Sequence, residues 1–468
     1  MSRRHRSVSL SPSRASFLLL CALLVVLWVA GGGSRADVMG QVIVRAAAWL
    51  ALMGGILFGS RPAINQFRPV WVLLLLAVFL CLLQLVPLPP DVWQALPGRS
   101  LFAEAAAATG QEQPWRPLAI VPGAAVNALS SLVVPLAVLL LASGLDEDDR
   151  DRLPGLFVAL VAGGACVGVL QFSGLGYRNA LINETPGAVG GVFANRNHFA
   201  LYLALGCLVV PVWAFQSRRK ATRPGGRWRP PVALGLILVF LLIILATGSR
   251  AGMLVGALAL VGAAILARRG VERMLGGRSR RLLLAFGAAA SVLVIGLVLI
   301  SVAVGRAVSV NRIFAVDPGQ DMRARGLSTV WSMLWRYFPA GSGLGSFDEM
   351  FRLQEPFFLL KLTYFNHAHN DFLEIVLNAG LPGLLLLLGA LGWWLAASLR
   401  AWPAERLSRD TTPALGSAML LLIGIASLFD YPARTPIIMA NIILAALWLA
   451  RVPIRAKTSA LPGTYQHL

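Results

Sequence analysis

The chain has 468 residues, of which 57% are hydrophobic and only 13% are charged, and its mean hydropathy is +0.72. A water-soluble globule of this composition would lack the polar surface that it needs, so the sequence predicts a polytopic, all-α integral membrane protein. The net charge of +20 does not indicate a nucleic-acid-binding protein, because the basic residues lie between apolar segments and not on a compact basic domain.

The first apolar run, residues 17–30, follows four arginines between positions 3 and 14. A basic flank before a short apolar core is typical of a cleaved signal peptide as well as of a first membrane span. The sequence Gly31-Gly32-Gly33-Ser34 after the run has no clear small-x-small cleavage pattern. We therefore expect a retained first span.

Eleven further apolar windows have about the 20 residues that a helix needs to cross roughly 30 Å of hydrocarbon. Together with the first run they predict about twelve transmembrane helices. In chain order, these windows lie near residues 38–59, 69–87, 124–143, 153–174, 197–215, 231–247, 250–267, 282–304, 372–397, 413–430 and 436–450.

The basic residues predict the orientation of these helices. If alternate connections are cytoplasmic, 26 of the 41 Lys and Arg residues lie inside, 14 lie outside and one, Arg45, lies within a span. Seven of the outside residues belong to one long loop, so the short loops divide 26 to 7, as the positive-inside rule requires. Both termini are therefore expected to be cytoplasmic.

The long outer loop, residues 305–370, is too long to be a simple connection between two helices. Residues 327–337 of this loop have a helical composition, and Gly341-Ser342-Gly343-Leu344-Gly345 must end any helix. Residues 347–362 are rich enough in apolar side chains to lie on the membrane surface, which predicts a structured cap. The expected organisation is one membrane domain in three parts: residues 1–304 with nine transmembrane helices, 305–370 as the long outer loop, and 371–468 with the last three helices and a cytoplasmic tail.

Polar clusters interrupt the apolar sequence at three places on the predicted outer face. An arginine at such a boundary can be an interfacial anchor whose side chain reaches the lipid headgroups. A tight turn between two spans needs glycine and serine, however, and has no need of an arginine. The clusters are Phe193-Ala194-Asn195-Arg196-Asn197-His198, Thr247-Gly248-Ser249-Arg250 and His367-Ala368-His369-Asn370-Asp371, followed by Glu374.

The His367-x-His369 pair has two chemical interpretations. It can ligate zinc, but alternate residues share a face only on an extended segment, and the sequence places no clear third ligand. A neutral imidazole beside arginines is better suited to accept a proton from a hydroxyl group. We therefore favour a general base and expect no metal site.

Arginines at a membrane surface match phosphate or pyrophosphate, which guanidinium groups bind in forked, charge-assisted pairs. Arg196, Arg250 and one arginine of the long loop can together hold such a group. If pyrophosphate is a leaving group, these arginines neutralise the charge that grows in the transition state. Many glycosyl transferases use a metal held by an acidic pair for this purpose, but the predicted outer segments contain no DxD motif.

Five motifs along residues 85–450 resemble, in order, the O-antigen ligase and polysaccharide polymerase superfamily of bacterial inner membranes. They are Pro87-Leu88-Pro89-Pro90, Asn195-Arg196-Asn197-His198, Thr247-Gly248-Ser249-Arg250, Gly341 to Phe347, and His369-Asn370 separated by nine residues from Gly380-Leu381-Pro382-Gly383. The resemblance implies a GT-C-like helical bundle in the inner (cytoplasmic) membrane. It also implies an active site that faces the periplasm, under the long periplasmic loop.

The resemblance further implies a metal-independent, inverting transferase without a cofactor, which moves a glycan from undecaprenyl diphosphate to an acceptor hydroxyl. By motif, Arg196 and Arg250 would hold the diphosphate, and Arg325 is preferred over Arg323 as a further arginine from the long loop. His369 would lie beside the acceptor or anomeric centre and is preferred to His367, because Asn370 and the glycine spacing register on it. The supporting residues would be Asn195, Asn197, His198, Ser249, Asn370, Gly343 and Gly345.

Several functions remain open from the sequence. A ligase, which transfers to lipid A core during lipopolysaccharide biosynthesis, is favoured over an O-antigen or exopolysaccharide polymerase, and both over a protein O-oligosaccharyltransferase. A twelve-span secondary transporter is the main alternative of another class. The sequence shows no two-fold repeat and few ionisable residues within its spans, which disfavours transport. A scaffold protein would leave Arg196 and the histidine cluster without a role.

Overall fold

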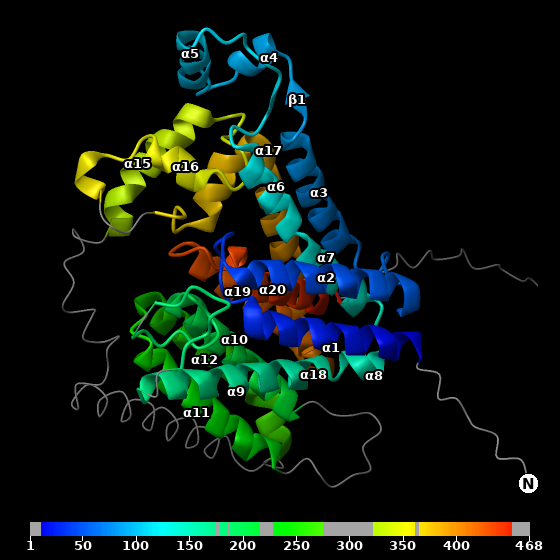
Figure 1. Cartoon of the computed structure of the whole chain (residues 1–468). Helices are drawn as coiled ribbons and strands as arrows, with labels where there is room; N and C mark the ends of the chain where they lie inside the picture. Colours follow the sequence, from blue (N-terminus) through cyan, green and yellow to red (C-terminus); the bar gives the residue numbers. More distant parts are fainter. Residues whose placement is uncertain are drawn as a thin grey trace, which may run out of the picture.

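The computed structural model is a bundle of helices with a smaller group of short elements at one side (Figure 1). Within the described part of the chain, the β structure is one antiparallel pair of two-residue strands, β1 (Pro87–Leu88) and β2 (Arg116–Pro117). The architecture is that of the all-α membrane protein that the composition predicts. The structure describes residues 11–174, 177–185, 187–215, 228–274, 322–360 and 365–451.

Eight helical segments in these ranges are long and apolar enough to cross a membrane, and three shorter apolar helices lie among them. The eight are α1 (Pro12–Ala30), α2 (Met39–Phe58), α6 with α7 (Pro122–Ser131 and Val133–Ser143), α8 with α9 (Glu147–Arg150 and Leu153–Phe172), α10 (Arg196–Phe215), α11 (Arg229–Ala246), α12 (Arg250–Met274) and α17 (Asp371–Ala401). The shorter three are α3 (Arg68–Gln84), α19 (Thr412–Ser427) and α20 (Pro436–Leu449).

The apolar windows correspond closely to these helices. Eleven of the twelve predicted windows are helical, and the remaining one, 282–304, lies outside the described residues. Since three of the eleven helices are short, the number of membrane crossings and the GT-C-like arrangement stay predictions. What the structure establishes is a multi-pass helical protein.

Helix α10 lies at the centre of the bundle. Its sequence is apolar on every side, and sixteen of its twenty residues are buried, which is typical of a helix surrounded by other helices. It packs against α9, α11, α12 and α19. Because α10 begins at Arg196, this packing fixes the position of that arginine at one end of the bundle.

Helix α17 is broken where the sequence predicts one continuous span. Gly380 has a φ of +60°, and a Cβ atom at this position would lie 2.0 Å from the carbonyl oxygen of Pro339. Only glycine fits so close an approach in this backbone conformation. The amide of Leu381 donates to the same Pro339 oxygen over 2.8 Å. The break therefore joins α17 to the residues just before Gly341–Gly345, which we call the glycine turn.

The cap consists of short helices from two distant parts of the sequence, which lie together beside the bundle (Figure 1). The helix predicted at 327–337 is present, and the glycine turn follows it as expected. A small apolar core that includes Val330, Met333, Phe347 and Phe351 holds these elements together. They are α4 (Pro90–Gln94), α5 (Ser100–Ala108), α15 (Met322–Tyr337), α16 (Phe347–Arg352) and the 3₁₀ turn η2 (Phe357–Leu359).

Arg99 is a fully buried side chain that ties the early part of the cap to the glycine turn. Its guanidinium donates hydrogen bonds to the carbonyls of Pro97 (3.0 Å), Leu118 (2.8 Å) and Gly341 (2.9 Å). Burial lowers the pKa of Arg99 to about 10, so the side chain stays charged at neutral pH. The charge is thus stabilised by backbone carbonyls, and the sequence alone gave no reason to single out this residue.

We expect Arg99→Ala to destabilise the protein, because one buried and two partly buried hydrogen bonds to carbonyls would be lost, at a cost of on the order of 3 kcal/mol in total. Thermal unfolding of the detergent-solubilised protein would measure this loss. Arg116→Ala is a suitable control, since Arg116 stacks over the Trp93 ring and its removal should cost only about 1 kcal/mol. Equal melting temperatures for the two variants would contradict the role assigned to Arg99.

Candidate functional site

A pocket of about 590 Å³ opens at the end of the bundle where α10 begins. One part of its wall is Gly32, Gly33, Ser34, Arg35 and Val38 of the α1–α2 connection, and another is the loop that contains Asn183 and Thr185. The remaining polar wall comes from the start of α10, from residues before α17, and from the turn between α19 and α20. These residues are Asn195, Arg196, Asn197, His198, Asn366, His369 and Tyr431.

Asp430, in the connection between α19 and α20, makes hydrogen bonds to several of these segments. Its side chain is only 2% exposed and accepts hydrogen bonds from the amides of Asn195 (3.0 Å) and Asn197 (2.6 Å). The same carboxylate lies 3.1 Å from Nδ1 of His369 and accepts the backbone amide of Tyr431. Burial of a carboxyl group is costly without hydrogen-bond partners, and here three chain segments supply them.

His369 reaches Asp430 from an unusual backbone conformation. It is the one non-glycine residue in the described ranges with a positive φ, at +52°. Such a conformation is uncommon for a residue with a Cβ atom, and at a binding site it indicates a functional constraint. In the tautomer in which Nδ1 donates to Asp430, Nε2 is the ring nitrogen that can act as a general base.

The other two histidines have different surroundings. His198 is 2% exposed, its Nδ1 lies 3.0 Å from the hydroxyl of Thr435, and its Nε2 lies 3.8 Å from Asp430. His367 pairs through Nδ1 with Glu374 Oε1 at 3.0 Å and is not among the described residues that line the pocket. Of the two predicted bases, His369 is therefore the one on the pocket wall.

Tyr431 brings the three histidines around one aromatic ring. Its ring centroid lies 5.1 Å from that of His198, 4.3 Å from that of His367 and 5.0 Å from that of His369. Its hydroxyl accepts a weak bond from Asn366 over 3.4 Å. The Tyr431 ring thus contacts all three imidazoles, and this packing restricts their orientation.

A buried ionic network lies behind this ring. The guanidinium of Arg434, in the 3₁₀ turn η3 (Pro432–Arg434), lies 3.1 Å from Glu374 and 3.4 Å from Asp371. Glu374 also accepts the amide of Ala368, and Asp371 accepts the hydroxyl of Ser427. These contacts fasten the start of α17, and with it the segment that carries His369, to the α19–α20 turn.

The predicted arginines occupy three different environments. Arg196 lines the pocket at the N-terminus of α10, where the helix dipole also favours an anion. Arg250 is the first residue of α12 and follows Ser249, whose hydroxyl donates to the side-chain oxygen of Asn197 over 2.7 Å. Arg325 lies over the Phe358 ring and donates to the Phe358 carbonyl. Of the described residues, those that line the pocket include neither Arg250 nor Arg325.

The remaining supporting residues are structural neighbours of the site. Asn370 caps α17 by accepting the amide of Leu373, and its own amide donates to Leu428. Gly343 and Gly345 have positive φ and lie close to Ala119 and to Ala124 of α6, outside the described pocket lining. The glycine turn is therefore explained by close packing.

Sequence reasoning missed the Asp430–Thr435 segment, although a signal for it was present. The segment is a short connection between the last two predicted spans, on the same predicted face as the other clusters. Like the turn that contains Arg250, it carries charges that a tight hairpin does not need. Arg35, which lines the pocket from the α1–α2 connection, was also missed.

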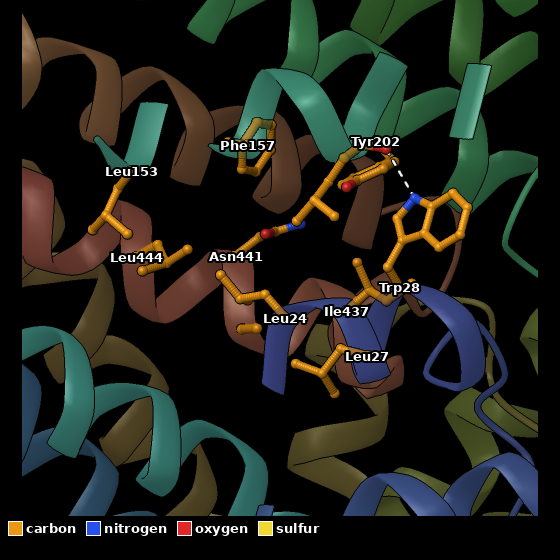
Figure 2. A pocket seen from close by; sticks show the side chains of 11 residues that line it. Leu24, Leu27, Trp28, Leu153, Phe157, Tyr202, Ile437, Asn441 and Leu444 are labelled. Carbon is orange, nitrogen blue, oxygen red and sulfur yellow. Dashed lines mark hydrogen bonds between the residues drawn. The ribbon is translucent and has the colours of Figure 1, made fainter. Parts of the chain in front are cut away.

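A second, apolar pocket lies within the bundle, between α1, α9, α10 and α20 (Figure 2). Its volume is about 20 Å³, which is enough for roughly one water molecule. Figure 2 shows the Asn441 amide and Tyr202 among leucine, isoleucine and phenylalanine side chains. The indole N–H of Trp28, beside them, donates to the carbonyl of Leu160 over 2.8 Å. This pocket is a packing defect of the core and is too small for a substrate.

The fold and the polar pocket define a multi-pass helical membrane protein with an arginine- and histidine-lined site at one end of its bundle. The O-antigen ligase family model matches residues 233–388 of the chain, which include Ser249, Arg250 and the His367–Asn370 segment. The resemblance to the O-antigen ligase superfamily is thereby confirmed over these residues, and the match supports a glycosyl-transfer function in general. No curated protein sequence matches the chain.

Proposed function

We propose that the pocket transfers a glycan from undecaprenyl diphosphate to an acceptor hydroxyl, with lipid A core as the acceptor of a ligase. The observation that carries this proposal is the His369–Asp430 pair on the wall of a pocket that also contains Arg196. A base and a phosphate-binding group then face the same space, which glycosyl transfer from a lipid diphosphate requires.

In the proposed reaction His369 Nε2 accepts the proton of the acceptor hydroxyl. The oxygen attacks the anomeric carbon as the bond from that carbon to the diphosphate oxygen breaks, so the anomeric configuration inverts. Asp430 holds the imidazole through Nδ1 and stabilises the imidazolium that forms. His367 is a weaker candidate base, because it is not among the described residues that line the pocket.

The leaving diphosphate gains negative charge during this displacement, and arginines can neutralise it. We assign this role to Arg196 on the pocket wall and to Arg250, which follows the serine bonded to Asn197. Arg325 remains the proposed arginine of the long loop. The site would open to the periplasm in the bacterial inner membrane, with both termini in the cytoplasm, as the distribution of basic residues predicts.

In this assignment arginines neutralise the charge of the leaving diphosphate, so transfer should not depend on a divalent metal ion. We expect the purified protein to transfer glycan at the same rate with and without EDTA in an assay with a lipid-diphosphate donor. A rate that falls in EDTA and returns with Mg²⁺ or Mn²⁺ would overturn the metal-independent mechanism while leaving the glycosyl-transfer function intact.

The surface glycan of a deletion strain tests the acceptor. Unligated, lipid-linked polymer would support a ligase, whereas single repeat units on the lipid A core would indicate a polymerase. An unchanged glycan profile with a lost solute uptake would overturn the proposal in favour of a transporter. Complementation with the wild-type chain should restore the parental profile.

A further inference from the structure

The α1–α2 connection is a rigid wall of the pocket. The carbonyl of Gly32 accepts the amide of Ala194 over 3.0 Å, and a Cβ atom at Gly32 would lie 1.7 Å from the carbonyl oxygen of Val192. The carbonyl of Gly33 accepts the buried side chain of Gln41 over 2.7 Å. This connection is therefore held tightly against the chain that leads into α10, and the residue after Ser34 is Arg35.

The pocket lining favours an anion. Among the described residues that form it are two arginines, Arg35 and Arg196, and two histidines, but no aspartate or glutamate. Asp430 lies beneath the wall, where the amides of Asn195 and Asn197 and the ring of His369 already use its oxygens. The lining thus contains cationic and imidazole side chains, and the carboxylate of Asp37, which pairs with Arg35, lies beside the lining and not in it.

Arg35 already holds a forked ion pair in the structure. Its Nε donates to Asp37 Oδ1 over 2.9 Å, and its Nη2 pairs with Asp37 Oδ2. The side chains of Arg35 and Asp37 are 37% and 63% exposed, so this pair contributes little stability. A phosphate group presents the same pair of oxygens with more charge, and can replace the carboxylate on the guanidinium fork.

We propose that Arg35 is a further anion-binding residue of this pocket, which binds a phosphoryl oxygen of a substrate by exchanging Asp37 for it. This inference rests on the proposed function, since it assigns part of the same substrate. Arg35 precedes the matched residues 233–388, so the family model does not include it. The phosphoryl group belongs either to the lipid diphosphate donor or to a phosphorylated acceptor.

Binding measurements on the purified full-length protein in detergent separate these sources. We expect Arg35→Ala to weaken binding of farnesyl diphosphate about tenfold to a hundredfold, the loss of one charge-assisted contact. Binding of the neutral alcohol farnesol should not change. Asp37→Asn, which removes the competing carboxylate, should tighten diphosphate binding. Arg178→Ala is a charge-matched control, because exposed Arg178 lies in the neighbouring loop but not on the pocket.

If the phosphoryl group comes from the acceptor, Arg35→Ala should leave farnesyl diphosphate binding unchanged and raise KM for phosphorylated lipid A core by a similar factor. This inference alone would be overturned if Arg35→Ala left both donor binding and acceptor KM unchanged while Arg196→Ala weakened donor binding. A wild-type protein that binds neither farnesyl diphosphate nor phosphorylated lipid A core would overturn the inference together with the proposed function.

Discussion

His369→Ala is expected to lower the rate of glycan transfer by about 10²- to 10⁴-fold, the usual contribution of a positioned general base. The side chain is 16% exposed and contacts Asp430 beside the pocket, outside the apolar core of the bundle, so its loss should leave membrane insertion intact. A transfer assay with a lipid-linked donor measures the rate, and the amount of protein in purified membranes is the control for insertion.

Asp430→Asn tests how His369 is oriented. The amide oxygen can still accept Nδ1–H, but it cannot stabilise an imidazolium, so we expect a loss of about tenfold to a hundredfold, smaller than that of His369→Ala. His367→Ala provides the comparison on the neighbouring histidine. Wild-type activity in His369→Ala, together with an inactive His367→Ala, would transfer the role of base to His367.

Arg196→Ala and Arg250→Ala are each expected to lower transfer by about 10²- to 10³-fold, because each would remove a donor to the charge that develops on the leaving diphosphate. The corresponding lysine variants keep the charge but lose the guanidinium fork, and should therefore recover only part of the activity. Measured kcat and KM for the donor distinguish loss in the transition state from loss of binding.

Arg178→Ala is again the control for a change in charge near the pocket. If Arg250→Ala has the activity of this control while Arg196→Ala is impaired, Arg250 is an anchor at the helix terminus and not a donor to the diphosphate. That result would fit the position of Arg250 outside the described pocket lining. It would leave the roles of Arg196 and His369 unchanged.

Much of the helical arrangement is predictable from the sequence, because the thickness of the membrane sets the length of each apolar segment. The break at Gly380 is not, since it depends on the carbonyl of Pro339, which the fold brings from outside the helix. The cap shows the same limit: the helix at 327–337 is predictable, but its union with α4 and α5 depends on the buried Arg99.

The candidate site is predictable to the extent that polar residues are costly in an apolar chain. Arg196 and His369 stand out for this reason, and the structure brings both to one pocket. Asp430 stands out less, because it is the last residue of an apolar window and its partners are distant in sequence, although the charges of its short connection were a signal. Arg325 was chosen from a motif, but the structure places its guanidinium over the Phe358 ring and not in the described pocket lining.

The central position of α10 constrains how the protein is made. This helix emerges early from the ribosome, yet one of the helices that surround it, α19, is synthesised about two hundred residues later. Until then α10 lacks part of its final surroundings, and Asn195 and Asn197 lack the carboxylate of Asp430. A nascent or C-terminally truncated chain therefore has helices in the membrane but no assembled pocket.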